Sequence, residues 1–328
     1  MPVIDSLNAY GSQVEVGAAA LGTMTFGNPV DAADARRMVE VAREGGVTLF
    51  DTANSYGDGE SERMLGDAVR TFRDEVVIAT KVGSRRIAAA DEVRLSPDAV
   101  RAAVDESLER LRTDYIDLYY LHMPDRGVAV EDTLGVMDEL VRVGKIRAVG
   151  QSNYPAWEIM QMRCISDREV HQPIRVSQLM YNILARRPEG SYADCTAALG
   201  IRNVVYNPLA GGLLSGRYFE YSASADGVAG TRFERELYRN RYWNPTQLEA
   251  VKELTAVAAR AGIPLHELAL RWIKHQPLVD TVLLGASSVD QLAQNLRAMQ
   301  KSPLDDEVHA GIDGVWERLG GVAPRYWR

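Results

Sequence analysis

Four residues of this sequence have side chains that could act together in proton transfer. Three of them directly follow short apolar runs: Asp51 follows VTLF, Lys81 follows VVIAT, and His122 follows YIDLYYL. Tyr56 comes shortly after Asp51, in the loop sequence ANSYGDG. If the three runs are neighbouring strands of a parallel sheet, about 4.8 Å apart, their carboxyl ends bring these side chains within contact range of one another.

The chemistry of such a group would be proton transfer to a carbonyl oxygen. An unperturbed tyrosine titrates near pH ~10, and an ammonium such as that of Lys81 lowers this value by favouring the phenolate. Asp51 would keep the lysine charged and in place, and His122 could hydrogen-bond the reacting oxygen. Each residue alone has an ordinary structural explanation, as a helix cap, a solvated loop lysine, a backbone-bonded histidine or a rim tyrosine. The four together favour a catalytic group.

Short β-branched runs alternate with longer segments of helical periodicity, which is typical of repeated βα units over a parallel sheet. Eight such runs cover residues 14–21, 47–50, 76–80, 115–121, 146–150, 175–178, 204–206 and 281–284. We therefore predict a single α/β domain over residues 1–328, a (β/α)8 TIM barrel. A β-hairpin of two short strands around Gly11 is expected to cap the barrel floor.

Capping residues mark the expected helix ends. Starts are predicted at Asp31, Ser96–Pro97 and Pro245, and C-caps at Gly45, Gly144 and Gly262. A long loop is predicted after strand seven, where residues 211–244 are rich in Gly, Ser, Arg and aromatic residues. We interpret this segment as a cover over a cofactor or substrate, and a disordered linker is the alternative.

The composition argues against several other classes of protein. With 328 residues, 46% apolar and 25% charged, the chain can bury a large core without disulfides. Its net charge of -8 disfavours nucleic acid and anionic membranes as partners. Cys164 and Cys195 lack metal or redox spacing and the histidines are scattered, so we predict reduced thiols and no metal site. The start of the sequence lacks signal-peptide features and no run reaches membrane-spanning length, which predicts a cytoplasmic protein.

Motifs of other common enzyme chemistries are absent from the sequence. It has no G-x-S-x-G, no G-x-x-x-x-G-K-[ST] and no H-E-x-x-H, so serine hydrolysis, P-loop phosphoryl transfer and zincin chemistry lack support. A G-x-G-x-x-G fingerprint is missing too. Any nicotinamide dinucleotide must then be bound by a fold other than the Rossmann fold.

Eight segments spread over almost the whole chain carry a family resemblance. They are LGTMTFG (21–27), LFDTANSYGDGESERMLGDAV (49–69), ATKVG (79–83), LERLRTDYIDLYYLHMPD (108–125), GKIRAVGQSNY (144–154), VSQLMYN (176–182), YNPLAGGLLSGRY (206–218) and LLGASSVDQLAQN (283–295). Together they resemble the aldo-keto reductase family. LYRNRYWN (237–244) and LLGASS are similar to the branch that contains aflatoxin-aldehyde reductases and potassium-channel β subunits.

The resemblance implies NAD(P)H-dependent reduction of an aldehyde or ketone to an alcohol in a (β/α)8 barrel. Tyr56 would be the general acid, Lys81 and Asp51 would tune it, and His122 would orient the carbonyl. The hydride would come from the nicotinamide, which leaves positioning and electrostatics to the protein.

The resemblance also implies where NADPH (NADP+) binds. Ser152, Asn153 and Gln178 would hold the carboxamide, Tyr206 would stack on the nicotinamide, and the glycine-containing segment after strand seven would follow the pyrophosphate. The full set of expected cofactor contacts is Gly22, Thr23, Met24, Asp51, Ser152, Asn153, Gln178, Tyr206, Asn207, Pro208, Leu209, Gly211, Leu213, Ser215, Arg217, Arg232, Gly285, Ser287, Gln291, Gln294 and Asn295.

The helix after strand eight is expected to bind the adenosine 2′-phosphate at its free amides. Many relatives carry Lys or Arg here and a Glu where this chain has Gln294. The phosphate would then fall to Ser287, Gln291 and Arg232, and use of NADH stays open. A plain capped helix explains Ser287 equally well.

An apolar and aromatic substrate pocket is expected at the same end of the barrel. Its candidates are Met24, Phe26, Tyr56, His122, Met123, Tyr154 and the tail residue Trp327. The substrate is a small-molecule carbonyl compound, and an aromatic aldehyde, a ketosteroid, a keto-sugar and a mycotoxin dialdehyde all stay open. The alternative function is a nucleotide-binding, redox-sensing regulatory subunit with incidental turnover. The sequence is also compatible with a homo-oligomer.

Overall fold

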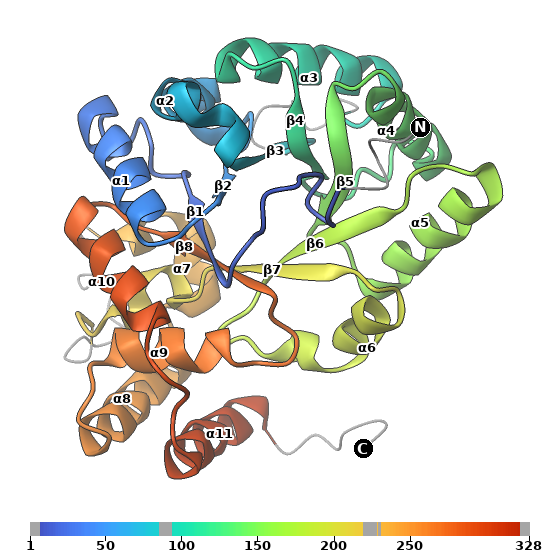
Figure 1. The fold of residues 1–328 in the computed structure, drawn as a ribbon. Helices are drawn as coiled ribbons and strands as arrows, with labels where there is room; N and C mark the ends of the chain where they lie inside the picture. Colours follow the sequence, from blue (N-terminus) through green and yellow to red (C-terminus); the bar gives the residue numbers. More distant parts are fainter. Residues whose placement is uncertain (1–6, 85–93, 219–227, 229–230, 322–328) are drawn as a thin grey trace. The chain divides into compact units, whose positions relative to one another are not determined.

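The structure is a computed structural model that describes residues 7–84, 94–218, 228 and 231–321, and eight parallel strands within these ranges form a closed barrel (Figure 1). The strands pair in chain order, and β1 closes the ring by pairing with β8. They are β1 (Ala19–Gly22), β2 (Leu49–Asp51), β3 (Val77–Val82), β4 (Ile116–Leu121), β5 (Ile146–Ser152), β6 (Ile174–Met180), β7 (Arg202–Tyr206) and β8 (Thr281–Gly285). The predicted (β/α)8 TIM barrel is confirmed.

The chain divides into two compact units. The barrel unit comprises Met1–Leu179, Pro188–Tyr206 and Leu278–Leu296, and the helical unit comprises Met180–Arg187, Asn207–Pro277 and Arg297–Arg328. The strand ends, apart from the last residue of β6, all belong to the barrel unit. The prediction of one domain over residues 1–328 stays a prediction.

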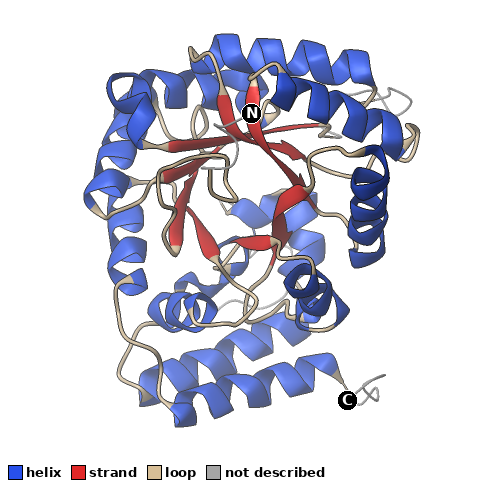
Figure 2. Ribbon diagram, turned by 45° about the vertical axis from the view of Figure 1, so that its right-hand side comes forward, coloured by secondary structure: helices blue, strands red, loops and turns tan. Residues whose placement is uncertain are grey.

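Helices of the barrel unit lie outside the ring of strands, as Figures 1 and 2 show for α1 to α6. They are α1 (Ala32–Glu44), α2 (Glu60–Val69), α3 (Pro97–Leu111), α4 (Val130–Arg142), α5 (Ala156–Glu169), α6 (Ser191–Ala198) and α10 (Val289–Met299), whose last turn belongs to the helical unit. The helical unit holds α7 (Glu236–Tyr242), α8 (Pro245–Arg260), α9 (Leu265–Lys274) and α11 (Asp306–Gly320). Short 3₁₀ helices are η2 (Tyr56–Gly59), η3 (Arg70–Glu75), η4 (Arg187–Glu189), η5 (Ala210–Ser215) and η7 (Arg232–Glu234). Within the described ranges, no helix combines the length and apolar character needed to cross a membrane.

Capping residues begin and end these helices where the sequence predicts them. The Asp31 carboxylate accepts a hydrogen bond from the Asp34 backbone N–H at 2.9 Å and caps α1, which ends at Gly45. Pro245 is the first residue of α8, and Gly262, with φ 67°, follows its end. The predicted ends of α1 and α8 are therefore confirmed.

Alternate strand residues point into the barrel and form an apolar layer there. The strand residues of this layer are Ala20, Leu49, Val77, Ala79, Leu118, Tyr120, Ala148, Val176, Val204 and Leu283, and Tyr10 from the segment before β1 packs with them. Because side chains on a strand repeat their direction every two residues, the next inward positions are Asp51, Lys81, His122, Gln178 and Tyr206. The strand period thus brings these polar side chains to the carboxyl end of the barrel, above an apolar floor.

The N-terminal segment differs from the prediction. The β-hairpin expected around Gly11 is wrong, because residues 7–18 form turns and contain no strand. The Asn8 side chain accepts from the backbone N–H of Tyr10 at 2.9 Å and donates to the Val14 carbonyl at 2.7 Å, so it takes up groups that a strand ladder would use. Tyr10 still reaches the inner core, where its hydroxyl bonds Thr281 Oγ1 at 3.1 Å.

The long segment predicted after strand seven lies in the helical unit. Its described residues form η5, η7 and α7, so for these residues the alternative of a disordered linker does not hold. Phe233 and Trp243 pack together in this segment with ring centroids 5.0 Å apart, and both are buried. Its role as a cover over a cofactor or substrate stays a prediction.

The two cysteines are free thiols, as predicted. Cys164 is exposed on α5, and Cys195 is half-buried on α6. Burial raises the pKa of the Cys195 thiol, which makes it less reactive than a solvated thiol.

Buried tyrosines make the stability of the fold sensitive to alkaline pH. Tyr119 and Tyr120 on β4 are fully buried, and burial raises the pKa of both well above the usual 10.0. The folded state holds these protons while the unfolded chain releases them. Their contribution to stability is therefore complete below pH ~10 and is lost as the pH rises towards the folded-state values.

We expect Tyr119→Phe to weaken this pH dependence. The Tyr119 hydroxyl has no hydrogen-bond partner among the described residues, so its removal should leave the free energy of unfolding at pH 8 unchanged or slightly higher. Between pH 8 and 11 the variant should lose about 1.4 kcal/mol less stability than the wild type. Guanidinium denaturation at both pH values measures this difference, and equal losses in the two proteins would contradict it.

Candidate active site

A buried ion pair forms the centre of the candidate site. Lys81 Nζ on β3 donates to Asp51 Oδ1 on β2, and it also donates to the Thr52 carbonyl at 2.6 Å. Gln178 Nε2 on β6 donates to the second oxygen, Asp51 Oδ2, at 2.7 Å. The side chains of Lys81 and Asp51 are 0% and 1% exposed, so water does not compete for these bonds.

Burial and pairing act in opposite directions on the pKa of both partners. Burial raises the pKa of Asp51, while the charge and hydrogen bond of Lys81 and the bond from Gln178 lower it. Burial likewise lowers the pKa of Lys81, and Asp51 opposes the shift. The pKa of Lys81 is thus lower than that of an ordinary lysine, and its ammonium is a stronger proton donor than an ammonium in water.

Tyr56 lies beside this pair because the chain turns sharply after it. Three consecutive residues, Gly57, Asp58 and Gly59, have positive φ of 57°, 53° and 86° and lead directly into α2. The turn leaves Lys81 Nζ 5.2 Å from the centre of the Tyr56 ring. A cation at this distance from a tyrosine ring stabilises a negative charge that develops on the phenol.

His122 also lies close to Tyr56. The two rings are 6.1 Å apart between centroids and nearly perpendicular, at 82°. The His122 backbone N–H continues the strand pairing by donating to the Val82 carbonyl at 2.8 Å. The structure therefore brings all four residues of the predicted catalytic group together within the barrel unit.

A chain of hydrogen bonds joins His122 to the ends of β5 and β7. Asn153 Nδ2 donates to the His122 carbonyl at 3.0 Å and to Ser152 Oγ at 2.9 Å. The Tyr206 hydroxyl donates to Asn153 Oδ1 at 2.8 Å. Asn153 has a positive φ of 65°, which asparagine tolerates better than most residues. Three residues expected to contact nicotinamide, Ser152, Asn153 and Tyr206, are thus bonded in one group.

Other expected cofactor contacts of the barrel unit lie around β1 and β8. Gly22 and Thr23 are buried at the end of β1, Met24 is half-buried, and Gly285 ends β8. Gln291 Oε1 accepts from both the backbone N–H (3.1 Å) and the Oγ (2.9 Å) of Ser287. The two Ser287 donors therefore point at one oxygen acceptor, Gln291 Oε1. A phosphate oxygen could accept from the same two donors. Asn295 is buried and Gln294 is exposed.

The remaining expected cofactor contacts belong to the helical unit. Asn207 fixes the turn into η5, since its Oδ1 accepts from the Gly211 N–H at 2.5 Å and its Nδ2 donates to the Tyr242 hydroxyl at 2.7 Å. Pro208 and Leu213 are buried, Leu209 is half-buried, Arg217 is exposed, and the Arg232 guanidinium lies 5.0 Å from the Tyr238 ring centre. Ser215 Oγ is buried without a hydrogen-bond partner among the described residues, which fits a segment that hydrogen-bonds a cofactor.

The expected substrate residues differ in exposure. Met123 is half-buried, and Tyr154 is buried with its hydroxyl donating to the Met123 carbonyl at 3.3 Å. Phe26 is 1% exposed and therefore belongs to the core. Trp327 lies outside the described residues.

Sequence reasoning missed three contributions to the site. It did not predict the bond from the Gln178 amide to Asp51, and the assignment of Gln178 to the carboxamide stays a prediction. It did not include the Thr52 carbonyl, which no side-chain pattern reveals, or the buried carboxylate of Glu62 behind β3. Glu62 has a readable signal, because an acidic residue stands on the apolar face of an amphipathic helix.

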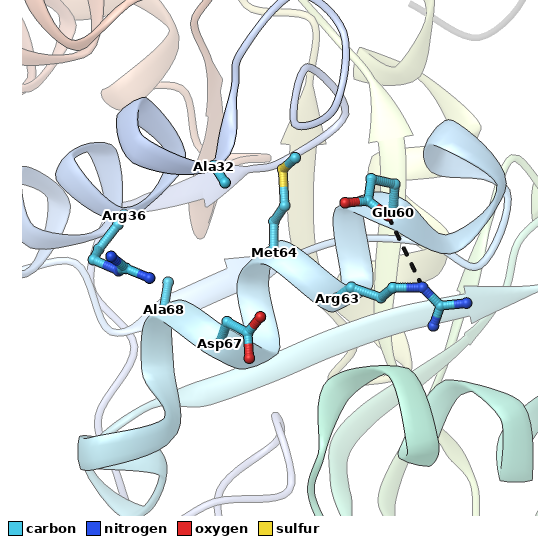
Figure 3. Close-up of a pocket in the computed structure, with 7 residues that line it drawn as sticks. All are labelled: Ala32, Arg36, Glu60, Arg63, Met64, Asp67 and Ala68. Carbon is cyan, nitrogen blue, oxygen red and sulfur yellow. Dashed lines mark ion pairs between the residues drawn. The ribbon is translucent and has the colours of Figure 1, made fainter.

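A shallow surface pocket of about 90 Å³ lies elsewhere, between α1 and α2 (Figure 3). Its lining residues are Ala32, Arg36, Glu60, Arg63, Met64, Asp67 and Ala68. Glu60 pairs with Arg63 at 3.9 Å, and Asp67 pairs with Arg112 at 2.6 Å. None of the predicted site residues lines it, so this pocket is not the candidate active site.

A (β/α)8 barrel with Tyr56, Lys81, Asp51 and His122 at its carboxyl end is suited to carbonyl oxidoreduction. The model of the aldo/keto reductase family matches residues 19–317, and the chain belongs to this family. It is an NAD(P)H-dependent oxidoreductase that acts on small-molecule carbonyl compounds.

Known relatives cover most of the chain. Aflatoxin B1 aldehyde reductase member 2 of Homo sapiens is 36% identical over 326 residues, which span 95% of this chain and 89% of the relative. A probable voltage-gated potassium channel subunit beta of Oryza sativa subsp. japonica is 31% identical over 291 residues, or 86% of each chain. Protein tas of Escherichia coli is 31% identical over 347 residues, which span 95% of this chain and 98% of the relative. These similarities confirm the family and the branch expected from the sequence.

We predict that Lys81→Met destabilises the protein by about 3–5 kcal/mol, because it leaves the Asp51 carboxylate buried without a cation. The double variant Asp51→Asn/Lys81→Met should recover much of this loss. Lys145→Met is the matched control, since Lys145 pairs with Asp105 at the surface with side chains 38% and 56% exposed, and it should cost less than about 1 kcal/mol. Chemical denaturation at pH 7 measures all three. Equal effects of Lys81→Met and Lys145→Met would refute the buried pair as a stability element.

Proposed function

We propose that this protein reduces an aldehyde or ketone with NADPH and that Tyr56 supplies the proton. The observation that carries the proposal is the fully buried Lys81 ammonium, bonded to Asp51 and 5.2 Å from the Tyr56 ring centre. A phenol next to a desolvated cation loses its proton more easily than a phenol in water.

The residues divide the work of the reaction as follows. Bound NADPH supplies the hydride that the carbonyl carbon accepts. As that carbon gains the hydride, the Tyr56 hydroxyl transfers its proton to the carbonyl oxygen, which becomes the alcohol. Lys81 stabilises the phenolate left behind, and Asp51 and Gln178 hold Lys81 and its counter-charge in place. His122 orients the carbonyl oxygen towards Tyr56.

Lys81 also provides a route for restoring the proton. Each turnover consumes one proton, which solvent supplies: because burial lowers the pKa of Lys81, its ammonium can pass a proton to the Tyr56 phenolate and take up another from solvent once the product has left. Asp51 limits this tendency because it favours the charged lysine. Lys81 can therefore act both as a fixed cation, which Asp51 favours, and as a proton donor, which burial favours.

We infer that the expected cofactor contacts divide by the part of NADPH that they bind. Ser152, Asn153 and Tyr206 would hold the nicotinamide, as their common hydrogen-bond chain supports. The η5 segment, whose Ser215 hydroxyl has no hydrogen-bond partner within the described part of the chain, would follow the pyrophosphate. Ser287 and Gln291 would bind the 2′-phosphate.

A second candidate function is that of a nucleotide-binding regulatory subunit. The 31% identity to a protein named as a probable potassium channel subunit beta supports it. Such a subunit would bind NADPH tightly and turn over slowly. The presence of the four residues of the catalytic group at one barrel end favours the reductase.

We expect Tyr56→Phe to lower kcat for reduction of 4-nitrobenzaldehyde by about 10²–10⁴-fold, because the proton donor is lost. NADPH binding, measured by quenching of protein fluorescence, should change by less than about 3-fold, since a hydroxyl is the only group removed. Tyr115→Phe, a change of the same kind on a tyrosine bonded to Asp74 outside the site, is the control. An unchanged kcat in Tyr56→Phe would remove Tyr56 from the mechanism. Tight NADPH binding without turnover in the wild type would favour the regulatory subunit.

Ser287→Ala tests the phosphate site. Loss of a hydrogen bond to a charged group should weaken NADPH binding by about 10-fold or more and leave NADH binding unchanged, because only NADPH carries the 2′-phosphate. Isothermal titration with both nucleotides measures the two affinities. Equal weakening of both would contradict the assignment of Ser287 to the 2′-phosphate.

A further inference from the structure

A second buried ion pair lies on the outer side of β3. Glu62, in the first turn of α2, is 0% exposed, and its Oε2 accepts from Arg110 Nε on α3 at 2.6 Å. Its other oxygen, Oε1, accepts from Thr80 Oγ1 on β3, also at 2.6 Å. We name Glu62, Thr80 and Arg110 the clasp. The clasp joins two helices to one strand of the barrel.

The clasp is connected to Lys81 through β3. Thr80 directly precedes Lys81, and successive side chains of a strand point to opposite faces. The clasp therefore holds β3 at Thr80, on the outer face of the strand. The next residue, Lys81, bonds Asp51 on the inner face. The negative charge of Glu62 also acts on Lys81, since it opposes the lowering of the Lys81 pKa by burial, after the larger effect of Asp51.

The clasp is connected to Tyr56 through the turn that precedes α2. Gly59 ends this turn with φ 86°, and a Cβ at this position would lie 2.5 Å from Arg110 Cδ. The Arg110 side chain thus packs against the turn, while its guanidinium bonds Glu62. Arg110 thus contacts the turn that follows Tyr56 and also the Glu62 carboxylate. Glu62 in turn bonds β3, the strand of Lys81.

Ser61, next to Glu62, extends these contacts to the ends of β1 and β2. Its hydroxyl lies 2.7 Å from Thr23 Oγ1 and 2.9 Å from Thr52 Oγ1. The Thr52 carbonyl in turn accepts from Lys81 Nζ at 2.6 Å. The first turn of α2 is therefore bonded to the chain at β1, β2 and β3, around the residues that hold Lys81.

Packing alone does not require a charge at position 62. A buried carboxylate costs several kcal/mol unless it is paired, and an apolar residue of similar size would fill the same space. The pairing is strong here: partial burial lowers the pKa of Arg110, but Glu62 and Glu106 outweigh this and raise it. A charged clasp adds two things that an apolar contact lacks, directional bonds and a field at Lys81.

We propose that Glu62 is a positioning residue of the reductase, which through Thr80 and Arg110 holds the Tyr56 turn and β3 together and supplies negative charge behind Lys81. This inference rests on the proposed role of Tyr56. The charged and titratable groups that face Lys81 are Asp51 on β2, Tyr56 in the turn, Tyr120 on β4 with its ring centre 5.7 Å away, and Glu62 beyond the strand. Loss of the Glu62 charge favours the neutral form of Lys81. As the pH is raised, the variant should therefore lose activity at a lower pH than the wild type.

Glu62→Gln tests this inference because the change keeps the size of the side chain and removes its charge. Glu106→Gln is the matched control: Glu106 pairs with the same Arg110 at 3.2 Å, but its side chain is 65% exposed and faces solvent. At pH 7, Glu62→Gln should lower kcat by about 10-fold or more, as a small misplacement of catalytic groups does. The NADPH dissociation constant should stay within about 2-fold of the wild type, and the alkaline midpoint of kcat should fall by about half a pH unit. Glu106→Gln should change none of these values.

The same kcat and the same alkaline midpoint in Glu62→Gln and Glu106→Gln would overturn the inference. If Glu62→Gln does not fold, Thr80→Val is measured instead, since it removes the bond to β3 and retains the ion pair. A lower kcat at an unchanged NADPH dissociation constant supports the positioning role, and an unchanged kcat overturns it. Tyr56→Phe distinguishes failure of the proposed function from failure of this inference. Full kcat in Tyr56→Phe would contradict the role of Tyr56 as proton donor, whereas an inactive Tyr56→Phe together with a normal Glu62→Gln would contradict only the role of Glu62.

Discussion

The desolvated ion pair between Lys81 and Asp51 is the constraint on which the rest of the structure depends. Removing an ammonium and a carboxylate from water costs several kcal/mol for each ion, and only their mutual attraction and further hydrogen bonds offset this cost. The protein supplies those bonds from the Thr52 carbonyl and Gln178. A cation held in this way cannot be screened by solvent, so its effect on a neighbouring phenol is large.

The barrel can hold such a pair because its strands carry apolar side chains in the inner layer and polar side chains at the carboxyl end. Leu49 and Ala79 point into the core, and the next inward residues on the same strands are Asp51 and Lys81. The same two-residue period brings His122 and Gln178 to this end. Outside the ring, the Ser61 hydroxyl and the Glu62 carboxylate in the first turn of α2 bond Thr52 and Thr80. Both faces of the strands therefore contribute to the position of one lysine.

Much of this arrangement is readable in the sequence, because strand period and capping residues are local signals. The runs before Asp51, Lys81 and His122 predicted both the barrel and the catalytic group. The turn at Asn8 was missed because a single side chain there satisfies the backbone groups that a hairpin would pair. The bond from Gln178 to Asp51 joins residues far apart in the chain, and the Thr52 carbonyl contributes through backbone alone, so neither leaves a pattern in a single sequence. Glu62 did leave one, as an acidic residue on the buried face of a helix.

In the mechanism we propose, Tyr56 and the Lys81–Asp51 pair act as one proton-donating unit. The most direct measurement is a kinetic double-mutant cycle by stopped flow, following single-turnover oxidation of bound NADPH by 4-nitrobenzaldehyde in the wild type, Tyr56→Phe, Asp51→Asn/Lys81→Met and the triple variant. Groups that work only together lose their effect together, so the triple variant should react about as slowly as Tyr56→Phe alone. Rate losses that multiply across the two sets of changes would contradict it.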